Sequence, residues 1–168
     1  VNVTRDITLT EAYEPDLLGS AGTVSANRGW ADRVNEVLVI YADNLSDIDL
    51  GALVAFHRGH GDPMTMALFH TEFPEKCGIA ELNGTGRITA FTEKPERPAS
   101  DLANAGIYVL DAAAWREIAD MDAFDFGFDV IPAYVGRMRG WLHEGYHRDI
   151  GTPEALACAE ADAAELFS

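Results

Sequence analysis

The chain has 168 residues, 48% of them hydrophobic and 24% charged, which is typical of one globular domain with a core of its own. Its formal net charge of −16 argues against a nucleic-acid or anionic-membrane partner, because both bind basic surfaces. No apolar run approaches the roughly 18–20 residues of a membrane-spanning helix, and no secretory signal is visible.

The first elements follow from hydrophobic periodicity. Loose alternation predicts a strand over residues 7–13, and a glycine-containing turn then leads into a helix over 21–30. The run EVLVIYADN, residues 36–44, is continuously apolar until Asp-Asn, as expected of a parallel strand buried on both faces. A capped helix within 46–61 and a strand over 63–71 follow.

The middle of the chain predicts a hairpin over 78–92, because Asn-Gly joins two alternating runs there. A buried strand over 103–110 comes next. Helix formers after an Asp cap predict a helix over 111–121, and a second helix is expected within 129–139.

The chain ends with a short strand over 140–145 and a helix over 151–167, which has Thr152 as N-cap and Pro153 at its first position. Strands therefore alternate with helices, which predicts an α/β fold with a mainly parallel sheet and one inserted antiparallel hairpin. The two cysteines show no metal or redox spacing, so we expect a reduced, cytoplasmic protein.

Two carboxylates stand where an α/β protein could hold a metal. Asp43 ends the 36–44 run, and ligands bind at the carboxyl ends of such strands. Asp149 precedes the last helix. Together they could bind a Mg²⁺ that also contacts phosphates. A turn residue is the alternative for Asp43, a simple loop residue is the alternative for Asp149, and the sequence alone does not show that they are adjacent.

The stretch FTEKP, residues 91–95, contains one of only two lysines in the chain. Glu93 can accept two sugar hydroxyl hydrogens, and Lys94 can meet a phosphate as a compact charge. A solvated strand end is the alternative. Gly19 and Gly22, in EPDLLGSAG, would let the backbone approach a flat ligand closely, although glycines also make ordinary turns.

Six motifs occur in one order along the chain: EPDLLGSAG, YADN, FTEKP, NAGIYVLD, DFGFDVIP and RDIGTP. In this order they resemble the sugar-1-phosphate nucleotidyltransferases, and most closely the branch similar to mannose-1-phosphate guanylyltransferases. The resemblance implies a Rossmann-like nucleotide-diphospho-sugar transferase fold with helices on both faces of the sheet. It also implies a Mg²⁺-dependent reaction of a nucleoside triphosphate with a sugar 1-phosphate.

The resemblance implies roles for particular residues. Asp43 and Asp149 match the metal ligands, and Lys94 matches the residue that holds the sugar phosphate, so these three are the implied catalytic residues. The implied substrate-binding residues are Glu14, Gly19, Gly78, Glu93, Asn104 and Gly106.

Glu14 bears on the base that would be used. Similar proteins that use uridine or thymidine carry Gln at this position, five residues before the loop glycine. A carboxylate can accept from both N1–H and N2–H₂ of guanine, whereas uracil and thymine present carbonyl oxygens that it would repel. Glu14 therefore favours GTP, with mannose 1-phosphate as the favoured sugar substrate.

Two departures from the family pattern qualify this expectation. Phe128 stands where many similar proteins have a phosphate-binding Lys, and nothing resembles the family's opening loop, G-x-G-T-R-L. We therefore expect residues 1–168 to be one N-terminally truncated domain, impaired in catalysis, with an exposed edge beside the 36–41 strand. A glucose-1-phosphate thymidylyl- or uridylyltransferase and a non-catalytic sugar-nucleotide-binding regulatory subunit are the alternatives. A homo-oligomer is compatible with the sequence.

Overall fold

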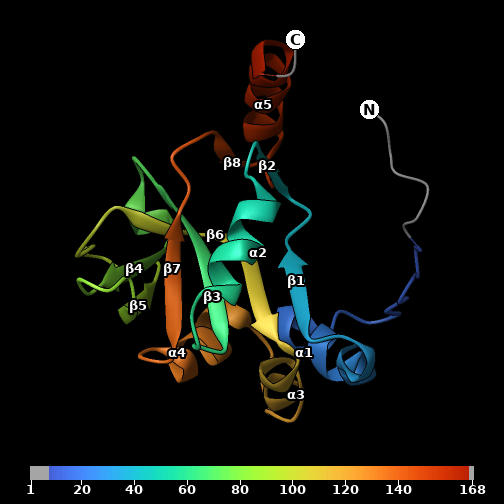
Figure 1. Cartoon of the computed structure of the whole chain (residues 1–168). Coiled ribbons are helices and arrows are strands. Elements are labelled where there is room, and N and C mark those ends of the chain that lie inside the picture. Colours follow the sequence, from blue (N-terminus) through green and yellow to red (C-terminus); the bar gives the residue numbers. More distant parts are fainter. Residues whose placement is uncertain (1–7, 167–168) are drawn as a thin grey trace.

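A six-stranded sheet organises the chain (Figure 1), and the structure, a computed structural model, describes residues 8–166. The strands are β1 (Glu36–Ile40), β2 (Asn44–Ser46), β3 (Met64–His70), β4 (Gly78–Leu82), β5 (Ile88–Glu93), β6 (Leu102–Asp111), β7 (Met138–Leu142) and β8 (His147–Asp149). The helical segments are α1 (Gly19–Ala26), η1 (Arg28–Arg33), α2 (Leu50–Arg58), η2 (Pro74–Lys76), α3 (Ala112–Ala119), the π-helical η3 (Phe126–Val130), α4 (Ile131–Tyr134) and α5 (Pro153–Leu166).

The long strand β6 lies at the centre of the sheet, whose order is β5-β4-β6-β3-β7. Its first half pairs with β3 and β4, and its second half pairs with β3 and β1. The predicted hairpin is confirmed as β4 and β5, closed by a turn in which the N–H of Gly86 donates to the carbonyl of Asn83 at 2.9 Å. Helices and strands share the chain as expected, so the α/β class is confirmed.

The pairing within the sheet differs from the prediction of a mainly parallel arrangement. Among the described strands only β3 and β7 run parallel, and every other pair is antiparallel. β1 pairs antiparallel with β6 and is partly exposed, so it is not the parallel strand buried on both faces that its apolar run suggested, although the expected exposed edge is there. A continuous apolar run indicates a hydrophobic strand but not its direction, so the prediction of a parallel strand was wrong.

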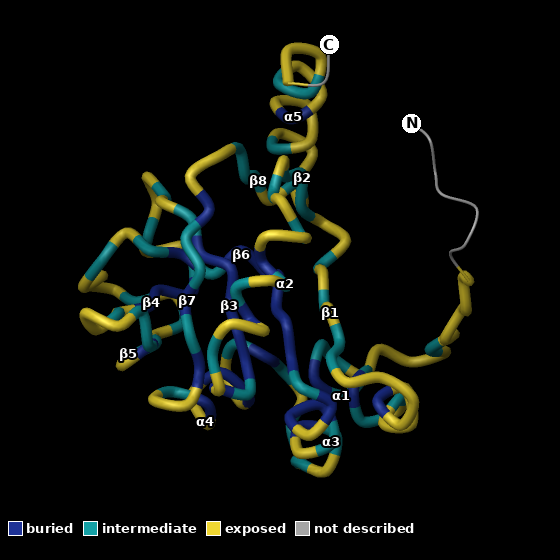
Figure 2. The backbone as a smooth tube through the Cα atoms, viewed as in Figure 1, coloured by how far each residue is buried: buried dark blue, intermediate teal, exposed yellow. Residues whose placement is uncertain are grey.

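Helices cover both faces of the sheet, as predicted. On one face α2 packs over a cluster of buried residues, Leu53, Ala67, Ala105, Ile107 and Val109. The larger core lies on the other face, between the sheet and α1, α3, η3 and α4. The buried tube in Figure 2 follows β3, β6 and the inner sides of these helices, whereas α5 and the stretch before α1 are mostly exposed. None of the described helices has the length and apolar character needed to cross a bilayer.

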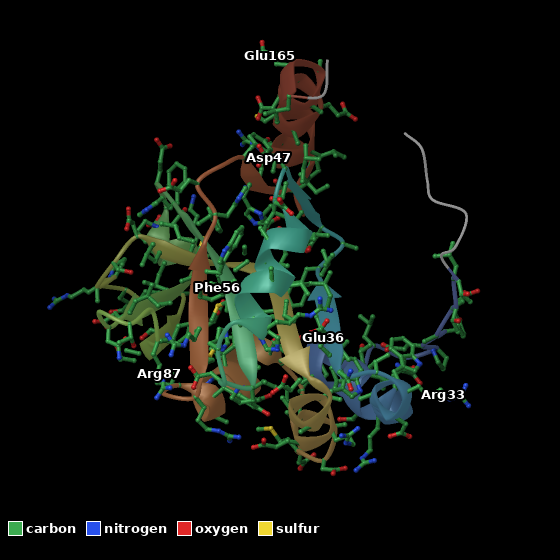
Figure 3. All side chains as sticks on the ribbon, in the orientation of Figure 1. Arg33, Glu36, Asp47, Phe56, Arg87 and Glu165 are labelled. Carbon is green, nitrogen blue, oxygen red and sulfur yellow. The ribbon has the colours of Figure 1, made fainter. Side chains whose placement is uncertain are left out.

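Polar contacts join the layers at the rim. Arg58 of α2 binds both carboxylate oxygens of Glu36 on β1, with the Nε contact at 3.1 Å, and this ties the helix to the edge strand. Figure 3 labels Glu36 on β1. Asp47, which follows β2, accepts from His143 at 2.8 Å. Figure 3 also shows Glu165 near the far end of α5, which stands away from the sheet.

Several boundaries correct the sequence prediction. Residues 8–13 form no regular strand, and Ile7 lies outside the described residues. The helix expected within 129–139 is a π-helical turn and a short helix, because the chain turns at Gly136, where φ is +81°, and β7 follows. The last helix is confirmed from Pro153 to Leu166, and the Thr152 hydroxyl caps it by accepting from the N–H of Ala155 at 3.1 Å.

The edge strand β1 carries the first testable prediction. Leu38 and Ile40 are 37% and 47% exposed, and the outer edge of β1 has no partner strand among residues 8–166. Because unpaired apolar edges promote association, Leu38→Lys should reduce aggregation measured by light scattering, with a stability change within about 0.5 kcal/mol. The control is Val39→Lys, whose side chain packs against the core, and it should lose about 2 kcal/mol or more. Equal aggregation of Leu38→Lys and the unchanged protein would rule out this edge as the cause.

Candidate active site

One cleft of about 290 Å³ opens where β2, β3, β4, β5, β6 and β8 and the loops beside them meet. It is lined by residues that the sequence places far apart. Seven of the nine predicted site residues line it: Asp43, Gly78, Glu93, Lys94, Asn104, Gly106 and Asp149. The structure therefore brings together the metal, phosphate and sugar residues that the resemblance implied.

The two carboxylates meet through a small sheet that the sequence did not reveal. β2 and β8 pair antiparallel, with Asn44 opposite Asp149, and the N–H of Ile150 donates to the carbonyl of Asp43 at 2.8 Å. A Cβ built on Gly151 would lie 3.0 Å from Asp149 Oδ1 and 3.8 Å from Asp43 Oδ2. Both carboxylates thus converge on one side of this loop, although more than a hundred residues separate them in the chain.

The pair of Asp43 and Asp149 fits Mg²⁺ better than it fits a metal ion whose ligands all come from the protein. Within residues 8–166 no group of three or more His, Cys, Asp or Glu could hold a metal ion. Mg²⁺ often binds through one or two carboxylates and completes its shell with water and substrate phosphates. The donor set of Asp43 and Asp149 matches that pattern.

Glu93 lies half-buried at the end of β5, and glycines provide the room for its carboxylate. A Cβ on Gly78 would lie 2.5 Å from Glu93 Oε2, and a Cβ on Gly127 would lie 2.8 Å from the same oxygen. Burial raises the pKa of Glu93, Asp125 adds to the rise, and the charge of Lys94 opposes it. No residue in the described part of the chain donates a hydrogen bond to the Glu93 carboxylate, so its oxygens can accept from a ligand.

The backbone of Lys94 adopts a conformation that is unusual for a residue with a Cβ. Its φ of +47° lies in the left-handed region, and its N–H donates to the carbonyl of Cys77 at 3.0 Å. Such strain persists where surrounding structure enforces it, often at ligand-binding positions. The other lysine of the chain, Lys76, also lines the cleft. A chain with net charge −16 therefore places both of its lysines around one cleft, which favours an anionic ligand there.

Asn104 and Gly106 shape the floor of the cleft on β6. Asn104 donates to the hydroxyl of Tyr108 at 2.7 Å and accepts from the N–H of Gly106 at 3.0 Å, so its amide already holds the local backbone. Gly106 has φ of +67°, and its carbonyl accepts from the N–H of Tyr41 at 3.0 Å. A Cβ there would lie 3.0 Å from the Tyr41 ring, which gives a packing reason for glycine.

Glu14 and Gly19 are the two predicted site residues that do not line the cleft. Gly19 begins α1 with φ of +76°, and a Cβ would lie 2.3 Å from the carbonyl oxygen of Phe124, so packing alone requires glycine here. The next residue, Ser20, accepts from the N–H of Phe126 at 2.9 Å, beside the 125–127 segment that contacts Glu93. Glu14 lies in the irregular stretch before α1 and makes no side-chain hydrogen bond with the described residues.

The cleft also contains residues that sequence reasoning missed: Tyr41, Asn44, Phe69, Lys76, Cys77, Ala105 and His147. Proximity to a motif could have indicated some of them, since Tyr41 and Asn44 flank Asp43 and His147 is two residues from Asp149. Phe69 had no such signal. Burial and, to a smaller extent, the nearby His143 lower the pKa of His147 to about 4, and Asp149 opposes the shift. Phe128 is 65% exposed on η3 and is not part of the cleft lining.

Gly78 supports a second testable prediction. In Gly78→Ala the new methyl group would lie 2.4 Å from the Phe91 ring as well as 2.5 Å from Glu93, so both side chains must move. We expect a loss of about 1–3 kcal/mol of stability, measured by thermal unfolding. Gly84→Ala, at the open hairpin turn with no atom within 4 Å of its Cβ position, is the matched control. Unchanged stability of Gly78→Ala would contradict this packing.

Comparison with known proteins now places the chain in a family. A family model described as nucleotidyl transferase matches residues 2–165. The chain belongs to the nucleotidyl transferase family. The resemblance to sugar-1-phosphate nucleotidyltransferases seen in the motifs is thereby confirmed at the level of the family.

This nucleotidyl transferase family member is similar to curated proteins named glucose-1-phosphate adenylyltransferase. It is 30% identical over 157 residues to the protein of Bacillus licheniformis and 28% identical over 157 residues to that of Bacillus subtilis. In both cases the match covers 86% of this chain and 41% of the relative, so the chain spans about two fifths of the length of these relatives.

A solved structure is also similar to this nucleotidyl transferase family member. It belongs to a Bacillus anthracis protein assigned as a glucose-1-phosphate thymidylyltransferase, in complex with a sucrose. The TM-score is 0.74 and the sequence identity 25%, with 88% of this chain and 62% of that chain covered.

Proposed function

We propose that this chain forms the sugar-phosphate and metal side of a sugar-1-phosphate nucleotidyltransferase. The reaction would join a nucleoside triphosphate to a sugar 1-phosphate, giving a nucleotide sugar and pyrophosphate. The observation that carries the proposal is that Asp43, Asp149, Glu93 and Lys94, from three separate segments, line one cleft. Membership of the nucleotidyl transferase family supports it independently.

The chemistry needs positioning and charge neutralisation rather than a protein nucleophile. A phosphate oxygen of the sugar 1-phosphate attacks the α-phosphorus of the nucleotide, that P–O bond forms, and the bond to the bridging oxygen of pyrophosphate breaks. Lys94 would hold the sugar phosphate, and Glu93 would accept hydrogens from sugar hydroxyls. Fixing both ends of the sugar phosphate orients its oxygen for in-line attack.

Asp43 and Asp149 would hold Mg²⁺ in this proposal. When bound, the cation would neutralise the charge that develops on the phosphates. Without it, two carboxylates beside a phosphate would repel the substrate. By holding the cation, the two Asp side chains would make this acidic edge of the cleft compatible with an anionic ligand.

For the substrates, we propose GTP from the carboxylate of Glu14, and mannose 1-phosphate from the motif resemblance. The names of the similar proteins favour glucose 1-phosphate as the alternative sugar phosphate, with adenylyl or thymidylyl transfer. Glu14 lies outside the cleft lining, so it would have to act on a base bound beyond the sugar site. A panel of GTP, ATP, dTTP and UTP with both sugar phosphates, read out by pyrophosphate release, separates these alternatives.

Glu93→Gln tests the proposal at the sugar. The substitution keeps the shape of the side chain but replaces a double acceptor with one acceptor and one donor. We expect calorimetric binding of mannose 1-phosphate or glucose 1-phosphate to weaken about 10–100-fold, because hydrogen bonds to charged groups contribute about 1.5–3 kcal/mol. The control is Glu81→Gln, exposed on the neighbouring strand β4. Binding by the unchanged protein should also fall with acidification at a higher pH than for an ordinary Glu, since its raised pKa favours the protonated form.

Two results would count against the proposal. Equal affinity of Glu93→Gln and the unchanged protein would remove Glu93 from the sugar site. A full-length protein that binds no hexose 1-phosphate and transfers no nucleotide would refute the proposed function itself.

A further inference from the structure

Two aromatic rings form one wall of the cleft, and the proposed chemistry leaves them unexplained. Phe69, on β3, and His147, on β8, both line the cleft. Their ring centroids lie 4.5 Å apart and their planes are inclined at 44°. The pair therefore joins the main sheet to the small β2–β8 sheet, beside the loop that brings the two metal-site carboxylates together.

The environment of His147 decides which nitrogen can meet a ligand. Nδ1 is buried and has no hydrogen-bond partner in the described part of the chain. A buried N–H without an acceptor is rare and costly, so the ring proton is best placed on Nε2. Nε2 is not among the buried unpaired atoms and bonds no described residue, which leaves an accessible N–H on a cleft-lining ring.

The position of His147 on β8 directs this donor toward the substrate. His147 and Asp149 are two residues apart on the strand, so their side chains lie on the same face. Asp149 lines the cleft from that face. A polar donor on an aromatic wall suits a sugar ring, which presents both C–H groups and hydroxyl oxygens.

We propose that Phe69 and His147 form the hexose-recognition wall of the cleft, with His147 donating a hydrogen bond from Nε2 to one sugar hydroxyl. This inference rests on the proposed function and deepens it, because it names the sugar ring of the hexose 1-phosphate as the group that the wall recognises. Glu93 accepts hydrogens from hydroxyls, whereas His147 donates to hydroxyl oxygens. Sites that hydrogen-bond a hydroxyl reject analogues that lack it, so His147 is a specificity residue rather than a catalytic one.

Calorimetric titration with mannose 1-phosphate, glucose 1-phosphate and their monodeoxy analogues tests this inference. His147→Phe keeps a ring against Phe69 but removes the donor, and it should bind the hexose 1-phosphate about tenfold more weakly. One monodeoxy analogue should bind the unchanged protein about tenfold more weakly than its parent sugar, yet bind His147→Phe as well as the parent does. His147→Gln, whose amide restores a donor, should recover most of the affinity.

The matched control is His70→Phe, the same change at an exposed histidine of β3 that does not line the cleft, and its binding should be unaffected. If His147→Phe does not fold, His147→Asn is titrated in its place, and it should show the same loss because its shorter amide does not reach the Nε2 position. Unchanged affinity and an unchanged deoxy-sugar pattern in the His147 variants would overturn the inference. The proposed function would still stand in that case if Glu93→Gln weakens binding. Absence of hexose 1-phosphate binding by the unchanged protein would overturn both together.

Discussion

Asp149→Asn and Asp43→Asn are each expected to lower turnover by on the order of 10²–10³-fold or more, because the neutral amide no longer holds the cation that offsets phosphate charge. Asn keeps the size of the side chain, so the small β2–β8 sheet should still form. The measurement is Mg²⁺-dependent pyrophosphate release by the full-length protein. The two single variants should be about as impaired as the double variant, since both act on one cation.

Asp49→Asn is the matched control for these substitutions. Asp49 lies near Asp43 in the chain but caps α2, where its carboxylate accepts from the N–H of Ala52 at 2.9 Å. Asn caps helices about as well as Asp, so this variant should retain normal turnover and stability. Normal pyrophosphate release by Asp43→Asn would refute the metal assignment.

Two substitutions of Lys94 are expected to weaken binding equally but to differ in stability. Lys94→Ala and Lys94→Gly should both weaken hexose 1-phosphate binding by at least about tenfold, because either change removes the cation proposed to meet the phosphate. The two variants should differ in stability. At φ of +47° a Cβ is strained, and Gly relieves that strain at some cost in unfolded-state entropy, so Lys94→Gly should be about 1 kcal/mol more stable than Lys94→Ala.

Calorimetry and denaturant unfolding measure these two effects separately. Arg97→Ala, which removes an exposed cation three residues along the same loop, is the control and should leave binding unchanged. Undiminished binding by Lys94→Ala would exclude the phosphate role. A Lys94→Gly variant less stable than Lys94→Ala would show that the left-handed backbone is not strained.

Local signals predicted the fold well where local interactions decide it. The hairpin of β4 and β5 follows from Asn-Gly between alternating runs, and α5 follows from Thr152 and Pro153 at its start. Strand β1 was located correctly as a strand, but it is antiparallel and half-exposed rather than parallel and buried on both faces. Whether an apolar strand is central or at an edge depends on what the rest of the chain packs against it, and the exposure of Leu38 and Ile40 became apparent only in the folded structure.

The candidate site likewise contains residues that the sequence indicated and residues that only the folded structure places there. Motif order indicated Asp43, Glu93, Lys94 and Asp149, and all four line the cleft. Phe69 and the three-residue strands β2 and β8 gave no usable pattern, because a strand so short has no measurable alternation. Their positions follow from contacts between distant segments.

What the sequence by itself determined is the α/β class, the hairpin, the last helix and the motif residues of a nucleotidyl transferase, because these depend on composition, short-range turn chemistry and motif order. Only the tertiary structure decided that β1 runs antiparallel to β6, that two distant carboxylates converge beside Gly151, and that Phe69 meets His147. The reason is physical. Burial, pairing direction and side-chain contacts depend on which distant segments pack together when the chain folds. The local sequence pattern around each residue does not contain that information.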